Sequence, residues 1–122
     1  MERLRILLVD DEEELVSALV ERLRFRSIES KYALNGTKAV AMLQVESFDA
    51  VVLDLKLPGI SGVDVHSIIK KEYPDLPVIL ITGHGAPLEQ LGFKPGEGCE
   101  FLEKPVRIEV LVDKIKDVAR KP

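Results

Sequence analysis

Polar residues that could do chemistry follow four of the short apolar runs in this chain. Asp10 and Asp11 follow the first run, Asp54 the third, Thr82 the fourth and Lys104 the fifth. A carboxylate is a nucleophile that can form an acyl phosphate, and hard oxygen ligands of this kind suit Mg²⁺. A lysine and a hydroxyl can neutralise and hydrogen-bond a phosphoryl group in transfer. Together these residue types favour metal-assisted phosphoryl chemistry, provided that the fold brings them to one place.

The apolar runs are typical of β-strands. Near-continuous apolarity and β-branched residues predict strands buried on both faces at Arg5–Val9, Ala50–Leu53 and Pro77–Ile81. Ile28–Ala33 alternates more, as a strand near the edge of a sheet does, and Glu100–Leu102 is a short fifth candidate.

Between the strands, apolar residues recur at spacings of three and four, which indicates helices with one buried face. The stripes are Leu15, Ala18, Leu19 and Leu23; Ala39, Val40 and Leu43; Val65, Ile68 and Ile69; and Ile108, Leu111, Val112 and Ile115. The segment 86–98 is interrupted by Pro and Gly. We therefore expect the fourth helix, which falls there, to be short or irregular.

Alternating strands and helices predict an α/β fold, a doubly wound parallel sheet with helices on both faces. The carboxyl ends of parallel strands lie along one edge, which is where such folds bind ligands. Asp10, Asp11 and Asp54 would meet there and repel one another unless a cation lay between them. This convergence is the main support for an Mg²⁺ site.

Composition narrows the class of protein. The 122 residues suit a single domain spanning 1–122, with a net charge of −4 and no concentrated basic stripe for nucleic acid. No apolar run approaches the ~18 residues of a membrane span, so we expect no membrane contact. A single cysteine, Cys99, fits a reducing cytoplasm.

Four segments resemble the signature segments of response-regulator receiver domains: ILLVDDEEELV, VVLDLKLPGISG, ITGHG and FLEKPV. Any one of them is a weak signal, but together they span essentially the whole chain in the family's order. The resemblance implies a flavodoxin-like fold with five strands in the order 2-1-3-4-5. It also implies a two-component signalling protein, either a stand-alone receiver or the N-terminal part of a longer regulator.

The resemblance also assigns roles. Asp54 matches the phosphoacceptor, Thr82 and Lys104 match the residues that contact the phosphoryl group, and Phe101 matches an aromatic switch residue. Mg²⁺ would be held by Asp11 and Asp54, by the backbone carbonyl of Lys56, and by Asp10 through a water. The family implies a cis Lys104-Pro105 bond.

Partners follow from the same resemblance. A sensor histidine kinase or phosphotransfer protein would supply the phosphoryl group in a phosphorelay, and an output domain or downstream protein would read the change. Phosphorylation could also drive formation of a homodimer. We expect a switch that catalyses its own phosphotransfer and slow dephosphorylation rather than an enzyme, and no direct contact with nucleic acid.

Other interpretations remain open. Asp10-Asp11 could simply cap a helix, and Phe101 could be an ordinary core residue. A haloacid-dehalogenase-like phosphatase also pairs a strand-end Asp with Mg²⁺, but Lys56 stands where that class has its second Asp. A pseudo-receiver would keep the fold without being phosphorylated, and the full set of site residues weighs against it.

Overall fold

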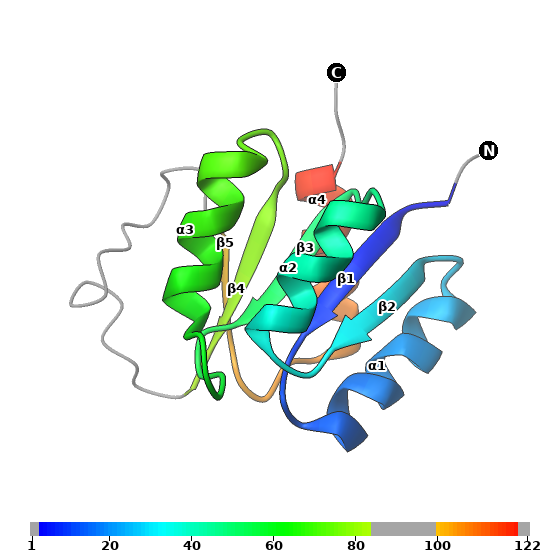
Figure 1. The fold of residues 1–122 in the computed structure, drawn as a ribbon. Helices are drawn as coiled ribbons and strands as arrows, with labels where there is room; N and C mark the ends of the chain where they lie inside the picture. Colours follow the sequence, from blue (N-terminus) through cyan, green and yellow to red (C-terminus); the bar gives the residue numbers. More distant parts are fainter. Residues whose placement is uncertain (1–2, 84–99, 120–122) are drawn as a thin grey trace.

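The computed structural model describes residues 3–83 and 100–119, where strands and helices alternate along the chain. The strands are β1 (Arg5–Val9), β2 (Glu29–Ala33), β3 (Ala50–Asp54), β4 (Val78–Thr82) and β5 (Glu100–Glu103). The helices are α1 (Glu13–Phe25), α2 (Gly36–Val45), α3 (Gly62–Glu72) and α4 (Ile108–Ala119), as Figure 1 shows. Among them, no helix is long and apolar enough to cross a membrane. The short helix expected within 86–98, and Cys99, lie outside the described residues.

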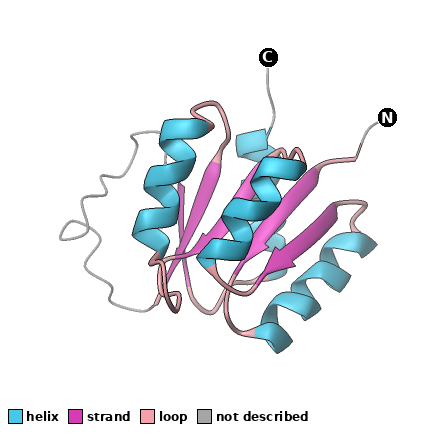
Figure 2. Cartoon of the chain, in the orientation of Figure 1, coloured by secondary structure: helices cyan, strands magenta, loops and turns pink. Residues whose placement is uncertain are grey.

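All strand pairs are parallel, in the order β2-β1-β3-β4-β5, which confirms the predicted doubly wound fold (Figure 2). Every residue of β3 and β4 is buried, as near-continuous apolar runs require when helices cover both faces. At the edge, β2 alternates between more and less exposed residues, as its sequence predicts.

Successive residues of each central strand enter different cores, because strand side chains alternate between the two faces of a sheet. Ile6 and Leu8 pack in the core that includes α1 and α4. Leu7 and Val9 pack in the core that includes α2 and α3. Figure 1 shows α2 and α3 together on the near face of the sheet. The result is three layers in which both faces of the sheet are covered.

The buried face of α1 differs from its predicted stripe at the beginning. Leu15 is 36% exposed, whereas Val16 is buried together with Leu19 and Leu23. Residues 16, 19 and 23 also have spacings of three and four, so the sequence is compatible with two starting points for the stripe. The position of the sheet selects the one that begins at Val16.

The first residues of the helices bear on the site. Asn35 caps α2 by accepting a hydrogen bond from the Lys38 N–H, and Ser61 caps α3 through the Asp64 N–H. Glu12 occupies the N-cap of α1, and its side chain makes no capping hydrogen bond. The carboxylate of Glu12 is therefore available for another partner.

The start of α3 lies against the end of β3 with no room for a side chain at Gly62. A Cβ on this residue would lie 2.4 Å from the Leu55 Cα and 2.5 Å from the Asp54 carbonyl oxygen. The Gly62 N–H also donates to the Leu55 carbonyl at 3.1 Å. Gly62 therefore fixes how closely α3 approaches the backbone that carries Asp54.

We predict that Gly62→Ala destabilises the fold, because the obstructing atoms are backbone and cannot rotate away. Overpacking of this kind lowers the free energy of unfolding by about 1–3 kcal/mol, which urea denaturation measures. Thr37→Ala, at an exposed position in the first turn of α2, is the control and should stay within about 0.5 kcal/mol of wild type. Equal stabilities for the two variants would contradict the close approach.

Candidate functional site

Strand register brings the polar residues to one edge of the sheet. Val9 pairs with Leu53, so the residues that follow them, Asp10 and Asp54, are neighbours. On the other side Asp54 pairs with Ile81, and Thr82 pairs with Glu103. Thr82 and Lys104 therefore follow on the next two strands, as the alternating pattern predicts.

Burial differs among the predicted site residues. Asp54, Asp10 and Thr82 are 3%, 4% and 6% exposed, and they are the buried polar residues of the described chain. Asp11 and Lys56 are exposed. The Lys56 backbone N–H nevertheless reaches inward and donates to Asp54 Oδ1 at 2.9 Å.

The Lys104 ammonium joins the acidic residues. Its Nζ donates to Asp54 Oδ2 at 2.8 Å and to Glu12 Oε1 at 2.6 Å, and it lies 3.5 Å from Asp10 Oδ2. The Lys104 backbone N–H donates to the Thr82 carbonyl at 2.9 Å, which continues the β4–β5 pairing to the site. The peptide bond to Pro105 is cis, as the family resemblance implies.

The electrostatics reflect this crowding. Burial raises the pKa of Asp10; the Glu12 N–H opposes this effect, and the charge of Asp54 adds to it. Burial alone would lower the pKa of Lys104, but its hydrogen bonds to Asp54 and Glu12 outweigh that effect and raise it. Lys104 in turn lowers the pKa of Glu12. The site therefore contains more negative charge than its lysine balances.

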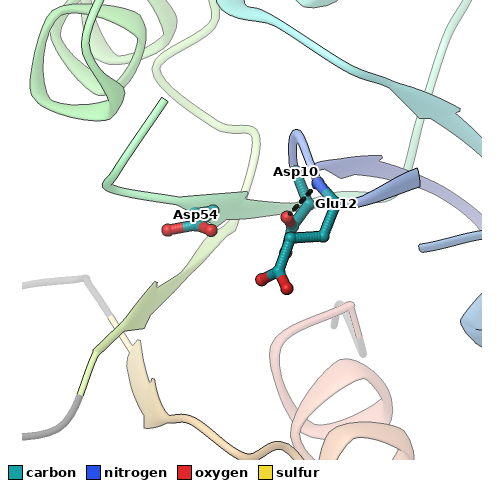
Figure 3. A group of neighbouring side chains, drawn as sticks. All are labelled: Asp10, Glu12 and Asp54. Carbon is teal, nitrogen blue, oxygen red and sulfur yellow. Dashed lines mark hydrogen bonds between the residues drawn. The ribbon is translucent and has the colours of Figure 1, made fainter. Parts of the chain in front are cut away.

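The arrangement of oxygen atoms suits a hard divalent cation. Asp10, Glu12 and Asp54 each offer a carboxylate oxygen, and these oxygens lie within 4.8 Å of one another (Figure 3). Asp11 lies outside this group, but it lines a cavity of about 400 Å³ together with Glu12, Asp54, Lys56, Gly83 and Lys104.

Glu12 was not among the predicted site residues. It belongs to a run of three glutamates at the start of a helix. Acidic residues are common there because their negative charge interacts favourably with the helix dipole. Only the turn after β1 brings its carboxylate to Lys104, a residue 92 positions away. No signal in the sequence distinguishes Glu12 from Glu13 or Glu14.

Phe101 lies on β5 beside Leu80 and is half-buried against the core that includes α2 and α3. This position is compatible with both interpretations, a core residue or a switch residue.

The fold and the acidic site agree with what the chain matches among known proteins. Residues 6–116 match the family described as the response regulator receiver domain, and the chain belongs to that family. It is thus a receiver domain of the kind found in two-component systems. Members of this family act as phosphoacceptor switches rather than as ordinary enzymes.

Individual relatives support the assignment. An NtrX-like response regulator of Rickettsia conorii is 37% identical over 114 residues, covering 92% of this chain and 24% of the relative. The transcriptional regulatory protein TcrA of Mycobacterium tuberculosis is 30% identical, covering 96% of this chain and 46% of the relative. The chain thus spans a quarter to a half of the length of these relatives.

Among solved structures, a response regulator receiver domain protein of Methanospirillum hungatei superposes with a TM-score of 0.88 at 29% identity. The match covers 97% of this chain and 94% of that one.

We predict that Asp10→Asn stabilises the metal-free protein at neutral pH, because the carboxylate is buried beside Asp54 whereas an amide carries no charge. Folding raises the pKa of Asp10, so its ionisation disfavours the folded state as pH rises above the unfolded value near 3.8. The gain in unfolding free energy should exceed ~0.5 kcal/mol at pH 7 and vanish near pH 3.

Urea denaturation in the presence of a chelator, repeated across this pH range, measures the difference. Asp11→Asn removes the same charge from the exposed neighbour and should change stability by less than ~0.5 kcal/mol at either pH. A destabilised Asp10→Asn protein at pH 7 would contradict the electrostatic account.

Proposed function

We propose that Asp54 accepts a phosphoryl group from a phosphohistidine of a sensor histidine kinase or phosphotransfer protein. The observation that carries this proposal is the position of Asp54, a residue that is 3% exposed at the end of β3 and whose Oδ2 lies 2.8 Å from Lys104 Nζ. An Asp54 oxygen forms a bond to phosphorus while the donor's P–N bond breaks, and the histidine nitrogen keeps the electron pair.

Mg²⁺ fits the donor set of this site. Asp11 and Asp54 would hold it through their carboxylates, Lys56 through its backbone carbonyl and Asp10 through a water. The close grouping of Asp10, Glu12 and Asp54 oxygens supports a cation here. When bound, Mg²⁺ supplies neutralisation of the charge on the transferring phosphoryl group.

Lys104 and Thr82 stabilise the phosphorylated state in this proposal. A Lys104–phosphoryl contact near 4 Å is worth roughly 4 kcal/mol at an effective dielectric of 20. A Thr82 hydrogen bond to a charged oxygen adds roughly 1.5–3 kcal/mol. Reversing a two-state equilibrium from 1:99 to 99:1 needs about 5.5 kcal/mol of differential interaction. The sum of these gross interaction energies has the size that such a switch needs.

The conformational change would pass from Thr82 to Phe101, which lies on the adjacent strand β5. An inward rotation of the Phe101 ring would then alter the surface that an output domain, a partner protein or a second copy of the chain contacts. The names of relatives such as TcrA describe transcriptional regulators, which favours a transcriptional output. A cytoplasmic location is part of this proposal.

We predict that incubation with acetyl phosphate adds one phosphoryl mass to the wild type, only when Mg²⁺ is present. Asp54→Asn should gain none, because an amide oxygen is a poor nucleophile and forms no acyl phosphate. Intact mass spectrometry measures the adduct.

Glu72→Gln, an exposed substitution at the end of α3, is the control for the loss of one acidic group and should be phosphorylated like the wild type. An adduct on Asp54→Asn would reassign the acceptor. A folded wild type with no adduct under any condition would favour the pseudo-receiver interpretation.

A further inference from the structure

Capping of helix α1 does not explain the side-chain position of Glu12. It is the N-cap of α1, where Ser, Thr, Asp or Asn is preferred, and its side chain makes no capping bond. Its carboxylate instead accepts from Lys104 Nζ at 2.6 Å, although 58% of the Glu12 side chain is exposed. A residue that departs from a local preference and turns toward a functional site is a candidate for a role there.

Both oxygens of Asp54 already have partners in this resting arrangement. Oδ1 accepts from the Lys56 N–H at 2.9 Å, and Oδ2 accepts from Lys104 Nζ at 2.8 Å. An anion placed on Asp54 must draw Lys104 to its own oxygens, and Glu12 holds the same ammonium. The Glu12 carboxylate would also repel the anion, because it lies in the group of oxygens within 4.8 Å of one another.

We propose that Glu12 is a positioning residue that holds the Lys104 ammonium in the resting state, and so favours a cation and opposes an anion at Asp54. The proposal rests on the proposed phosphorylation of Asp54. Glu12 would thereby keep the unphosphorylated state populated when no donor is present. The phosphoryl group contacts the Lys104 ammonium only when Glu12 releases that ammonium or shares it.

The proposal makes two predictions of opposite sign for Glu12→Gln. Removing the negative charge should weaken Mg²⁺ binding, because the oxygen cluster becomes less negative. The same change should strengthen the binding of beryllofluoride, a phosphoryl mimic, because Lys104 is released and repulsion falls. Each affinity should change roughly two- to fivefold, the size expected of one exposed ion pair. Damage to the site would weaken both.

Titration calorimetry with MgCl₂ and ¹⁹F NMR titration of beryllofluoride at saturating Mg²⁺ measure the two affinities. Glu14→Gln is the matched control, because it removes the same charge from an exposed position in the first turn of α1. A double variant of Glu12→Gln and Lys104→Met, compared with Lys104→Met alone, tests whether Glu12 acts through the lysine. The gain in beryllofluoride affinity caused by Glu12→Gln should be at most half as large when Lys104 is absent.

Opposite shifts in Glu12→Gln, absent from Glu14→Gln and reduced without Lys104, support the proposal. If the wild type binds both probes but Glu12→Gln matches Glu14→Gln, or loses both affinities together, the role of Glu12 is overturned while the proposed function stands. An undiminished gain without Lys104 overturns the positioning role. If the wild type binds neither probe, the proposed function fails and the role of Glu12 fails with it.

Discussion

The contact between the Lys104 ammonium and the carboxylates of Asp54, Glu12 and Asp10 is the interaction on which the site depends. Asp10 follows β1, Glu12 is the N-cap of α1, Asp54 ends β3, and the lysine follows β5. Buried carboxylates repel one another, so their proximity is tolerable only with a cation between them. Because the partners lie at residues 10, 12, 54 and 104, the site exists only once β1, β3, β4 and β5 have paired. The pairing of the strands therefore determines the chemistry that the site can perform.

Most of the fold could be predicted because the composition of each strand reflects how deeply that strand is buried. Ala50–Asp54 is buried at every residue, and an uninterrupted apolar run has few other uses in a chain of this length. Helix faces were harder, since the apolar residues of α1 fit a stripe starting at Leu15 or at Val16. The choice between these two starting points depends on how the helix lies on the sheet, which local spacing does not encode. The strand order came from the resemblance to receiver domains, not from the pattern of residues.

The site could be predicted at the level of strand ends and not at the level of side chains. Asp54 and Thr82 end strands, and Asp10 and Lys104 directly follow strands, so parallel pairing alone brings them to one edge. The division between Asp10, which is buried, and Asp11, which is exposed, is set by the turn after β1. The same turn brings Glu12 to Lys104. Such turns depend on the neighbouring strands and the following helix together, which explains why Glu12 was missed.

The region around the amino ends of β1 and β2 shows why burial matters more than the types of residue present. There Arg5 pairs with Glu29 and Glu46, and Lys31 also pairs with Glu46. These four side chains are 23–49% exposed, so water screens them and each pair contributes little. At the carboxyl edge, by contrast, the Asp10 and Asp54 side chains are 6% and 4% exposed. The same kinds of charged group form screened surface ion pairs in one place, whereas in the other their burial leaves negative charge that a cation would relieve. Unbalanced and buried charge, rather than acidic composition, is what marks this edge of the sheet as the candidate functional site.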